Sequence, residues 1–253
     1  MFDLRLVSAE MLKLRRRRGM LSIALLATLG SMLIGFTVLV IQHGGNPAKY
    51  GPAGGLANYQ GAIDFLALMA LVMGAIVGAT AGTQDIESGV FRDLAATGRS
   101  RMALFGSRVT GAWGVALPIA ALAAAFAAAA SVALAGSLAA PGAGALAAGT
   151  ALALTATALS TAIGVGVAAL VGSRGPVIGI LLAFFLAIEP LLQQLSFLGN
   201  GRQAIPSVAL HRIGDLPAVS DIHVALGGAI AVVIAWTAAA VAAGAWRTRT
   251  REI

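Results

Sequence analysis

The chain has 253 residues, of which 58% are hydrophobic and 11% are charged, and its mean hydropathy is +0.90. Soluble domains carry about 25% charged residues because their surfaces face water, so this composition excludes an ordinary soluble globule. The absence of cysteine excludes disulfides and thiolate metal sites. The net charge of +7 comes from basic clusters beside apolar runs, an arrangement that indicates contact with a lipid bilayer and not with nucleic acid.

Residues 1–19 predict an amphipathic helix. Leu4, Val7, Met11 and Leu14 follow the spacing of one helical face. We expect this N-terminal helix to lie in the inner membrane interface and to turn into the membrane at the four consecutive arginines 15–18. The simpler alternative is that the arginines only fix the topology.

Apolar runs divide the rest of the chain into membrane spans. A helix needs about 20 apolar residues to cross the hydrocarbon layer. Residues 109–173 contain no charge, and turn-forming residues at 140–144 split them in two. The predicted spans lie at about 20–41, 62–83, 109–134, 146–171, 177–192 and 224–246. The sequence therefore predicts an all-α polytopic membrane protein with one transmembrane domain over residues 1–253 and an extracellular loop at 193–223.

The distribution of Lys and Arg predicts the orientation. With the N-terminus inside, only Lys49, Arg202 and Arg212 of the 17 basic residues fall outside. Because basic residues concentrate in cytoplasmic segments, we expect a multi-pass protein of the plasma (inner) membrane with both termini in the cytoplasm. The glycines at 74, 78 and 82 form a small-residue stripe, which we interpret as a packing face within the chain and not as a dimer contact.

The inner segment 84–108 predicts a short amphipathic helix. Ile86, Val90 and Leu94 recur every four residues, and we place Asp85 and Glu87 in the first turn, where a helix favours negative charge. Such a helix suggests docking, either onto the base of the bundle or onto a partner. The residues alone leave both alternatives open.

This segment resembles the loop between the second and third spans of permeases of the type-2 ATP-binding-cassette exporter family. The matching residues are Glu87, Gly89, Phe91, Leu94, Ser100, Arg101, Leu104, Gly106 and Arg108. Residues 9–15 also resemble the stretch before the first span in such permeases. Gly98 and Arg99 stand where the family often has a proline before Ser-Arg.

The resemblance implies that the inner segment is a coupling helix, which would contact a separate ATP-binding subunit. The residues that it assigns to this role are Asp85, Glu87, Gly89, Phe91, Arg92, Leu94, Arg99 and Arg101. The sequence has no G-x-x-x-x-G-K-[ST] phosphate loop, so we expect a non-catalytic subunit without a cofactor of its own, with ATP and Mg on the partner. The resemblance also implies a second permease, identical or related.

Two acidic residues lie in apolar surroundings. Asp64 is near the outer end of the second predicted span, and Glu189 precedes Pro190 at the end of the fifth. Carboxylates inside a membrane usually face a cavity or a partner, so both are candidates for the transport pathway. The alternative for Glu189 is a position at the outer headgroup level.

Other functions fit less well. A secondary transporter or channel normally needs more ionisable residues or broken helices in its spans. A membrane-embedded enzyme would need a polar cluster at one depth, and the sequence offers no catalytic constellation. The histidines at 43, 211 and 223 lack the i, i+4 spacing of a zinc site. The favoured function is the permease subunit of an ATP-driven exporter that works by alternating access.

Overall fold

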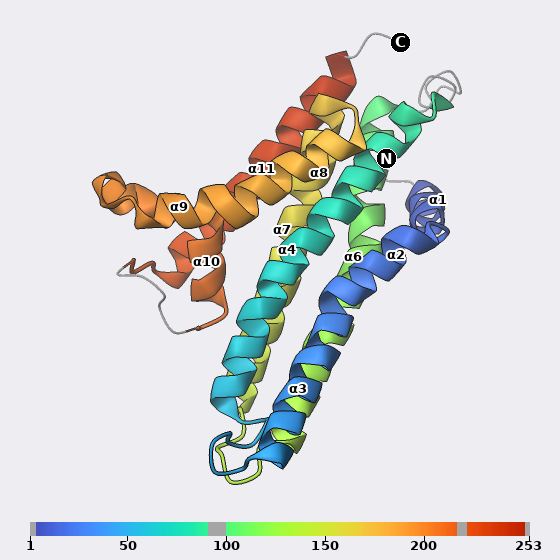
Figure 1. The fold of residues 1–253 in the computed structure, drawn as a ribbon. Coiled ribbons are helices and arrows are strands. Elements are labelled where there is room, and N and C mark those ends of the chain that lie inside the picture. The colour runs from blue at the N-terminus through green and yellow to red at the C-terminus, as the bar shows by residue number, and fades with distance from the viewer. Residues whose placement is uncertain (1–3, 91–99, 217–221, 251–253) are drawn as a thin grey trace.

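The computed structural model describes residues 4–90, 100–216 and 222–250, and within these ranges the protein contains helices and no strands. Six helical segments are long and apolar enough to cross a membrane, which confirms the predicted fold class. These segments are Arg18–Gly45, Leu56–Glu87, Arg101–Ala133, Ala143–Val171, Arg174–Gln194 and Leu226–Thr250. In Figure 1 the N- and C-terminal ends of the chain lie at the same end of the molecule, as an even number of spans requires.

The spans are built from the following elements. The first span combines α2 (Arg18–Leu25), a π-helical turn (Leu26–Gly30) and α3 (Ser31–Gly45). The next three are α4 (Leu56–Glu87), α6 (Arg101–Ala133) and α7 (Ala143–Val171). The fifth combines α8 (Arg174–Ala183), a π-helical turn (Phe184–Ile188) and α9 (Glu189–Gln194), and the sixth is α11 (Leu226–Thr250). Two short helices, a 3₁₀ helix (Ser196–Ala204) and α10 (Pro206–Ile213), connect the last two spans.

Helices α4 and α7 form the centre of the bundle and run side by side (Figure 1). They approach closely because glycines on α4 meet small residues on α7. A Cβ added at Gly82 would lie 3.0 Å from the carbonyl oxygen of Val165, and one at Gly74 would collide with the side chain of Ser160. The glycine stripe is therefore a packing face within the chain, as we expected from the sequence. Small side chains allow this backbone approach without a large hydrophobic core.

The N-terminal helix α1 (Leu4–Arg15) packs on α6 of the same chain. Its predicted apolar face makes this contact: Leu14 is fully buried, and Met11 lies against Gly114 of α6. Glu10, which we expected outside that face, is also buried, and its Cβ lies close to Gly111. The amphipathic pattern is thus used mainly for contact with protein.

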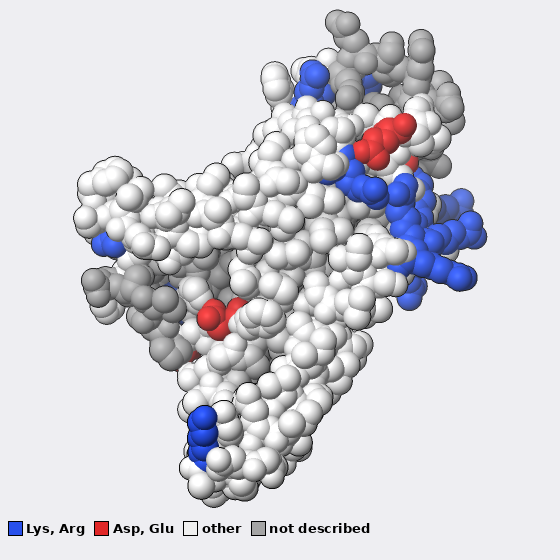
Figure 2. Space-filling model, viewed as in Figure 1, with Lys and Arg blue, Asp and Glu red and all other residues white. Residues whose placement is uncertain are grey.

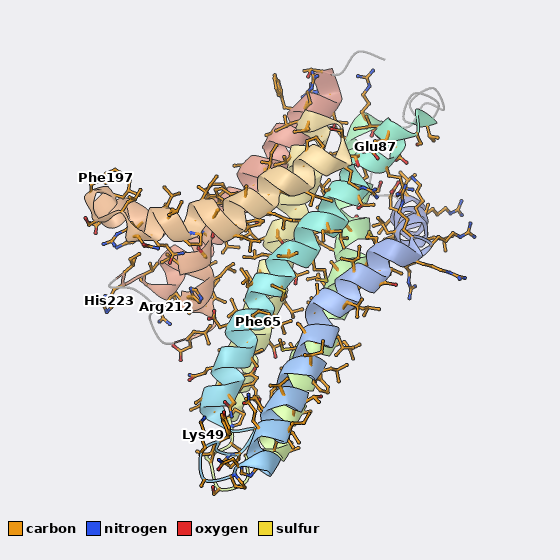
Figure 3. The ribbon with its side chains drawn as sticks, viewed as in Figure 1. Lys49, Phe65, Glu87, Phe197, Arg212 and His223 are labelled. Carbon is orange, nitrogen blue, oxygen red and sulfur yellow. The ribbon has the colours of Figure 1, made fainter. Side chains whose placement is uncertain are left out.

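The connection between the fifth and sixth spans is partly packed against the bundle. In Figure 1 the span from α8 to α9 runs at a steep angle to α4 and α7, and α10 lies below its far end. Helix α10 buries Val208 and Leu210, whereas Phe197 at the tip of the arm is exposed (Figure 3). The segment that we predicted as a loop at 193–223 therefore contains a docked helix.

Candidate functional site

A buried cluster of charged residues joins three elements at the end of the molecule that holds both termini. Arg108 of α6 donates a hydrogen bond from a guanidinium nitrogen to Asp85 Oδ2 of α4 at 3.0 Å. Lys13 of α1 donates to Asp85 Oδ1 at 3.0 Å and to Glu10 Oε1 at 2.7 Å. Asp85 and Arg108 are almost fully buried. The cluster therefore fixes α1, α4 and α6 to one another through a single carboxylate.

The ionisation of the α1 residues fits this arrangement. Burial is the main cause that raises the pKa of Glu10 above its ordinary value, and the hydrogen bond from Lys13 offsets part of it. Burial lowers the pKa of Lys13, but its hydrogen bonds and the charges of Glu10 and Asp85 raise that pKa more, so the net shift is upward. Lys13 therefore keeps its positive charge at neutral pH and remains a partner for Asp85.

The expectation that Asp85 and Glu87 begin a separate helix was wrong. Both lie in the last turn of α4, which continues to Glu87. Negative charge at the C-terminal end of a helix is unfavourable, but here each carboxylate has a donor. Asp85 has Lys13 and Arg108, and Glu87 Oε1 accepts a hydrogen bond from the backbone N–H of Arg174 at 2.6 Å. The helix can therefore extend beyond the apolar run that sequence patterns detect.

Gly89 ends this extension of α4. Its φ is +75°, a left-handed conformation that favours glycine, and the N–H of Ser88 donates to the carbonyl of Gln84 at 3.1 Å. This is the usual way for a helix to terminate. Nothing lies within 4 Å of a Cβ added at Gly89, so the backbone conformation and not space requires glycine. Gly89 therefore ends α4 within the segment that we assigned to coupling.

The remaining residues of that segment divide into two groups. Phe91, Arg92, Leu94 and Arg99 lie outside the described residues. Ser100 caps α6, because its side-chain oxygen accepts from the N–H of Ala103 at 3.1 Å. Arg101 donates to the carbonyl of Arg249 at 3.1 Å, which links the start of α6 to the end of α11. Figure 3 places Glu87 at the same end of the molecule as α1, with Lys49 at the opposite end.

A second polar cluster lies nearer the other end of α4. His211 Nε2 of α10 and Asp64 Oδ1 of α4 are 2.7 Å apart. Glu189 Oε2, at the start of α9, accepts from the N–H of Ser207 in the first turn of α10 at 3.2 Å, and Gln193 donates to the Ser207 hydroxyl at 2.9 Å. These contacts hold both ends of α10 against α4 and α9. Figure 2 shows acidic atoms at the surface in the hollow beside α4, below the arm formed by α8 and α9.

The two acidic residues that we predicted for the pathway therefore differ in environment. Glu189 is buried, and its Oε1 has no hydrogen-bond partner among the described residues, whereas the Asp64 side chain is about half exposed at 48%. Glu189 is placed to cap α10, where a helix N-terminus favours an acceptor. Asp64 contacts His211 near the other end of α10. The structure brings both to the same short helix, which the sequence had not indicated.

Replacing Glu189 with alanine should loosen α10. The substitution removes the acceptor of the Ser207 N–H, which is partly buried, and loss of such a hydrogen bond costs about 0.5–1.5 kcal/mol. We expect faster amide hydrogen exchange in Pro206–Ile213 and a lower melting temperature. Glu189→Gln keeps a carbonyl oxygen at the same place and should change both values little. Unchanged exchange in Glu189→Ala would contradict the capping role.

The described residues contain no group of three or more His, Asp or Glu side chains placed to hold a metal ion. His43 contacts the carbonyl of Tyr50 at 2.8 Å, and His211 contacts Asp64. The charged cluster around Asp85 pairs its cations with its carboxylates. Its arrangement suits mechanical linkage of helices more than binding or chemistry.

Sequence reasoning missed part of this cluster. Arg108 entered only as a matching basic residue, and the pattern of α1 left Glu10 and Lys13 off its apolar face without assigning them a contact. A signal was present in the i, i+3 spacing of Glu10 and Lys13, which allows an ion pair on one helix face. Their contact with Asp85 joins residues that are 72 positions apart and has no local signature.

The fold, with six apolar spans and a linked charged end, defines a polytopic α-helical membrane protein. Comparison with protein families then identifies its class. The sequence model of a family described as "ABC-2 family transporter protein" matches residues 6–189. The match covers most of the chain, so the protein belongs to the ABC-2 transporter family and is a membrane component of that kind. No curated protein matches the sequence.

Proposed function

We propose that this chain is the permease subunit of an ATP-driven exporter and that the segment after α4 couples it to a separate ATP-binding subunit. The observation that carries the proposal is the buried Asp85 cluster. It lies at the last turn of α4, directly before the residues proposed for coupling. A force applied to that segment would be transmitted to α1 and α6 as well as to α4.

The contact of Glu87 with Arg174 supports the same role. It links the end of α4 to the turn between α7 and α8, which is the next inner connection in the proposed topology. The link between Arg101 and the end of α11 adds the sixth span. The inner ends of most spans are therefore connected close to the proposed coupling segment. Closure of an ATP-bound partner could move them together, as alternating access requires.

The earlier assignment of Asp85 as a contact residue changes in this proposal. Because its carboxylate is buried and paired, Asp85 would act through Lys13 and Arg108 and not by touching the partner. Glu87, Ser88 and Gly89 are exposed and lie at the end of α4. These residues, with Phe91, Arg92, Leu94, Arg99 and Arg101, are the proposed contact region.

Replacing Gly89 with valine should uncouple transport from ATP hydrolysis. A β-branched residue at a φ of +75° is strained by roughly 1–3 kcal/mol, so the coupling segment would leave α4 in another direction. We expect stimulation of the ATPase by the permease to fall by about 5–150-fold, the range of typical coupling free energies. The measurement is ATP hydrolysis and transport by the reconstituted complex.

Asparagine provides the matched control, because it tolerates this conformation better than other side chains. Gly89→Asn should therefore retain most of the stimulation. Glu87→Lys should also uncouple, whereas Glu87→Gln keeps an acceptor for the Arg174 N–H and should be milder. Full stimulation in Gly89→Val, with normal membrane insertion, would refute the coupling role.

The proposal also includes the partners and the orientation. It places both termini in the cytoplasm, ATP and Mg on the ATP-binding subunit, and a second permease, identical or related, beside this one. Pull-down of the intact complex would identify these partners. A protein that purifies without an ATPase, and whose transport persists after ATP depletion but stops when a proton or sodium gradient is removed, would instead be a secondary transporter.

A further inference from the structure

The junction between α1 and α2 presents an exposed basic surface. Residues 15–18 are four consecutive arginines, and the helix breaks between Arg15 and Arg18. Arg17 is half-buried and donates from Nε to the Gln84 side chain at 3.1 Å. Arg15, Arg16 and Arg18 are exposed. Among the described residues, no carboxylate lies within ion-pair distance of these three.

The structure separates the basic residues of this region into two sets. Lys13 and Arg17 are directed to partners on α4, namely Asp85 and Gln84. The other three arginines are exposed, and Figure 2 shows a patch of basic atoms at the N-terminal end of the first span. The positive-inside rule accounts for the presence of positive charge. That rule does not require the arginines to lie next to one another at the end of a helix that packs against the bundle.

Apolar side chains on both sides of the patch indicate what covers it. Leu4 and Leu12 of α1 are exposed at 73% and 52%, so the start of the predicted apolar face is not covered by α6. Ile23 and Leu26 at the start of the first span are exposed as well. Such a surface, with arginines between two exposed apolar stretches, matches the headgroup layer of a bilayer. There, leucines and the aliphatic parts of arginine side chains contact acyl chains, and the guanidinium groups remain among the polar headgroups.

We propose that Arg15, Arg16 and Arg18 bind the phosphate groups of anionic phospholipids. Guanidinium groups match the geometry of phosphate oxygens and bind them through paired hydrogen bonds. The contact of α1 with α6 and the Lys13–Asp85 ion pair hold the site in place. A headgroup bound here therefore stabilises the position of α1 and, through Lys13, the Asp85 cluster. The site itself does not depend on the proposed coupling to an ATPase.

Lipid binding to the full-length protein tests this site directly. The purified protein in detergent is titrated with phosphatidylglycerol or with phosphatidylcholine of the same acyl chains, and bound lipids are counted by native mass spectrometry. The wild type should prefer phosphatidylglycerol. Arg15→Gln, Arg16→Gln and Arg18→Gln together should lower its affinity by about fivefold for each arginine removed. Raising the salt concentration should weaken the preference further.

Two control variants keep the test specific. Replacing the same three residues with lysine retains the charge and should preserve most of the preference. Arg247→Gln with Arg249→Gln removes exposed cations from the end of α11 and should leave the preference unchanged. Excess inorganic phosphate at constant ionic strength should not displace the lipid, because it lacks the acyl chains that occupy the apolar margin.

Several results would overturn the proposal. Equal affinity of the wild type for the two lipids would do so without any variant. A preserved preference in the folded glutamine variant would do so as well, with folding checked by helicity and melting. If that variant keeps its lipid preference but loses binding of an ATP-binding subunit, the patch is a protein contact. Because lipid binding is measured on the permease alone, its failure leaves the coupling proposal untouched, and the reverse also holds.

Discussion

Asp85→Ala is expected to destabilise the protein by about 3–5 kcal/mol, the usual cost of removing one partner of a buried ion pair. The Asp85 carboxylate contacts both Arg108 and Lys13, and Arg108 is only 1% exposed. Without the carboxylate, this guanidinium loses an anionic partner in a place where water does not reach it. We expect a melting temperature about 10 °C lower in detergent, together with loss of the α1 contact.

Two further variants test whether the destabilisation comes from loss of the Asp85 ion pairs or from any substitution at this end of α4. Glu87→Ala removes a carboxylate two residues away, but an exposed one, and should cost less than about 1 kcal/mol. Arg108→Met combined with Asp85→Ala should recover part of the loss, because replacing both partners of a buried pair is often tolerated. A cost for Asp85→Ala no larger than that for Glu87→Ala would show that the cluster does not hold the helices together.

The number of spans could be predicted from the sequence because it depends on local composition. Uncharged runs of about 20 residues suit hydrocarbon thickness, and each of the six predicted spans lies at a helix of the structure. The ends were less well predicted. Helix α4 begins at Leu56 and ends at Glu87, beyond the apolar run, because its terminal charges find partners elsewhere in the chain.

The candidate site was predicted only in part, since its contacts connect distant residues. Asp85 and Glu87 were singled out as charged residues next to a span, but their partners come from α1, α6 and the turn before α8. Asp64 and His211 are separated by 147 positions. Periodicity reports which face of a helix is apolar. It does not report which other helix covers that face, and so α1 was assigned to the membrane interface alone.

Gly78→Ala should disrupt the contact between α4 and α7. A Cβ at Gly78 would lie 3.0 Å from Gly164 Cα and still closer to the carbonyl oxygen of Thr161. Both neighbours are backbone atoms, so the clash can be relieved only if the two helices separate. Overpacking of this kind costs about 1–3 kcal/mol. The loss should appear as a lower melting temperature and a lower yield of folded protein.

Gly61→Ala is the matched control on the same helix. Nothing lies within 4 Å of a Cβ at Gly61, and alanine is favoured over glycine in a helix by about 1 kcal/mol, so this variant should be neutral or more stable. Gly164→Ala places a methyl group in the same contact from the other side, 3.0 Å from Gly78 Cα. Gly164→Ala should lower the free energy of unfolding about as much as Gly78→Ala does. The loss in the double variant should be smaller than the sum of the two single losses, because the same separation of α4 and α7 relieves both clashes.

Transport and ATP hydrolysis provide a second measurement for Gly78→Ala, because α4 connects the two polar clusters. One helix carries Asp85 in the charged cluster and Asp64 in the contact with α10, and the glycine stripe lies between them. If movement at the proposed coupling segment reaches α10 through α4, loosening the contact of α4 with α7 should reduce transport more than it reduces ATP hydrolysis. If Gly78→Ala lowers the melting temperature but leaves the amount of substrate transported per ATP hydrolysed unchanged, the movement does not reach α10 through the contact of α4 with α7. Helix α6, which carries Arg108, would then be the next helix to test.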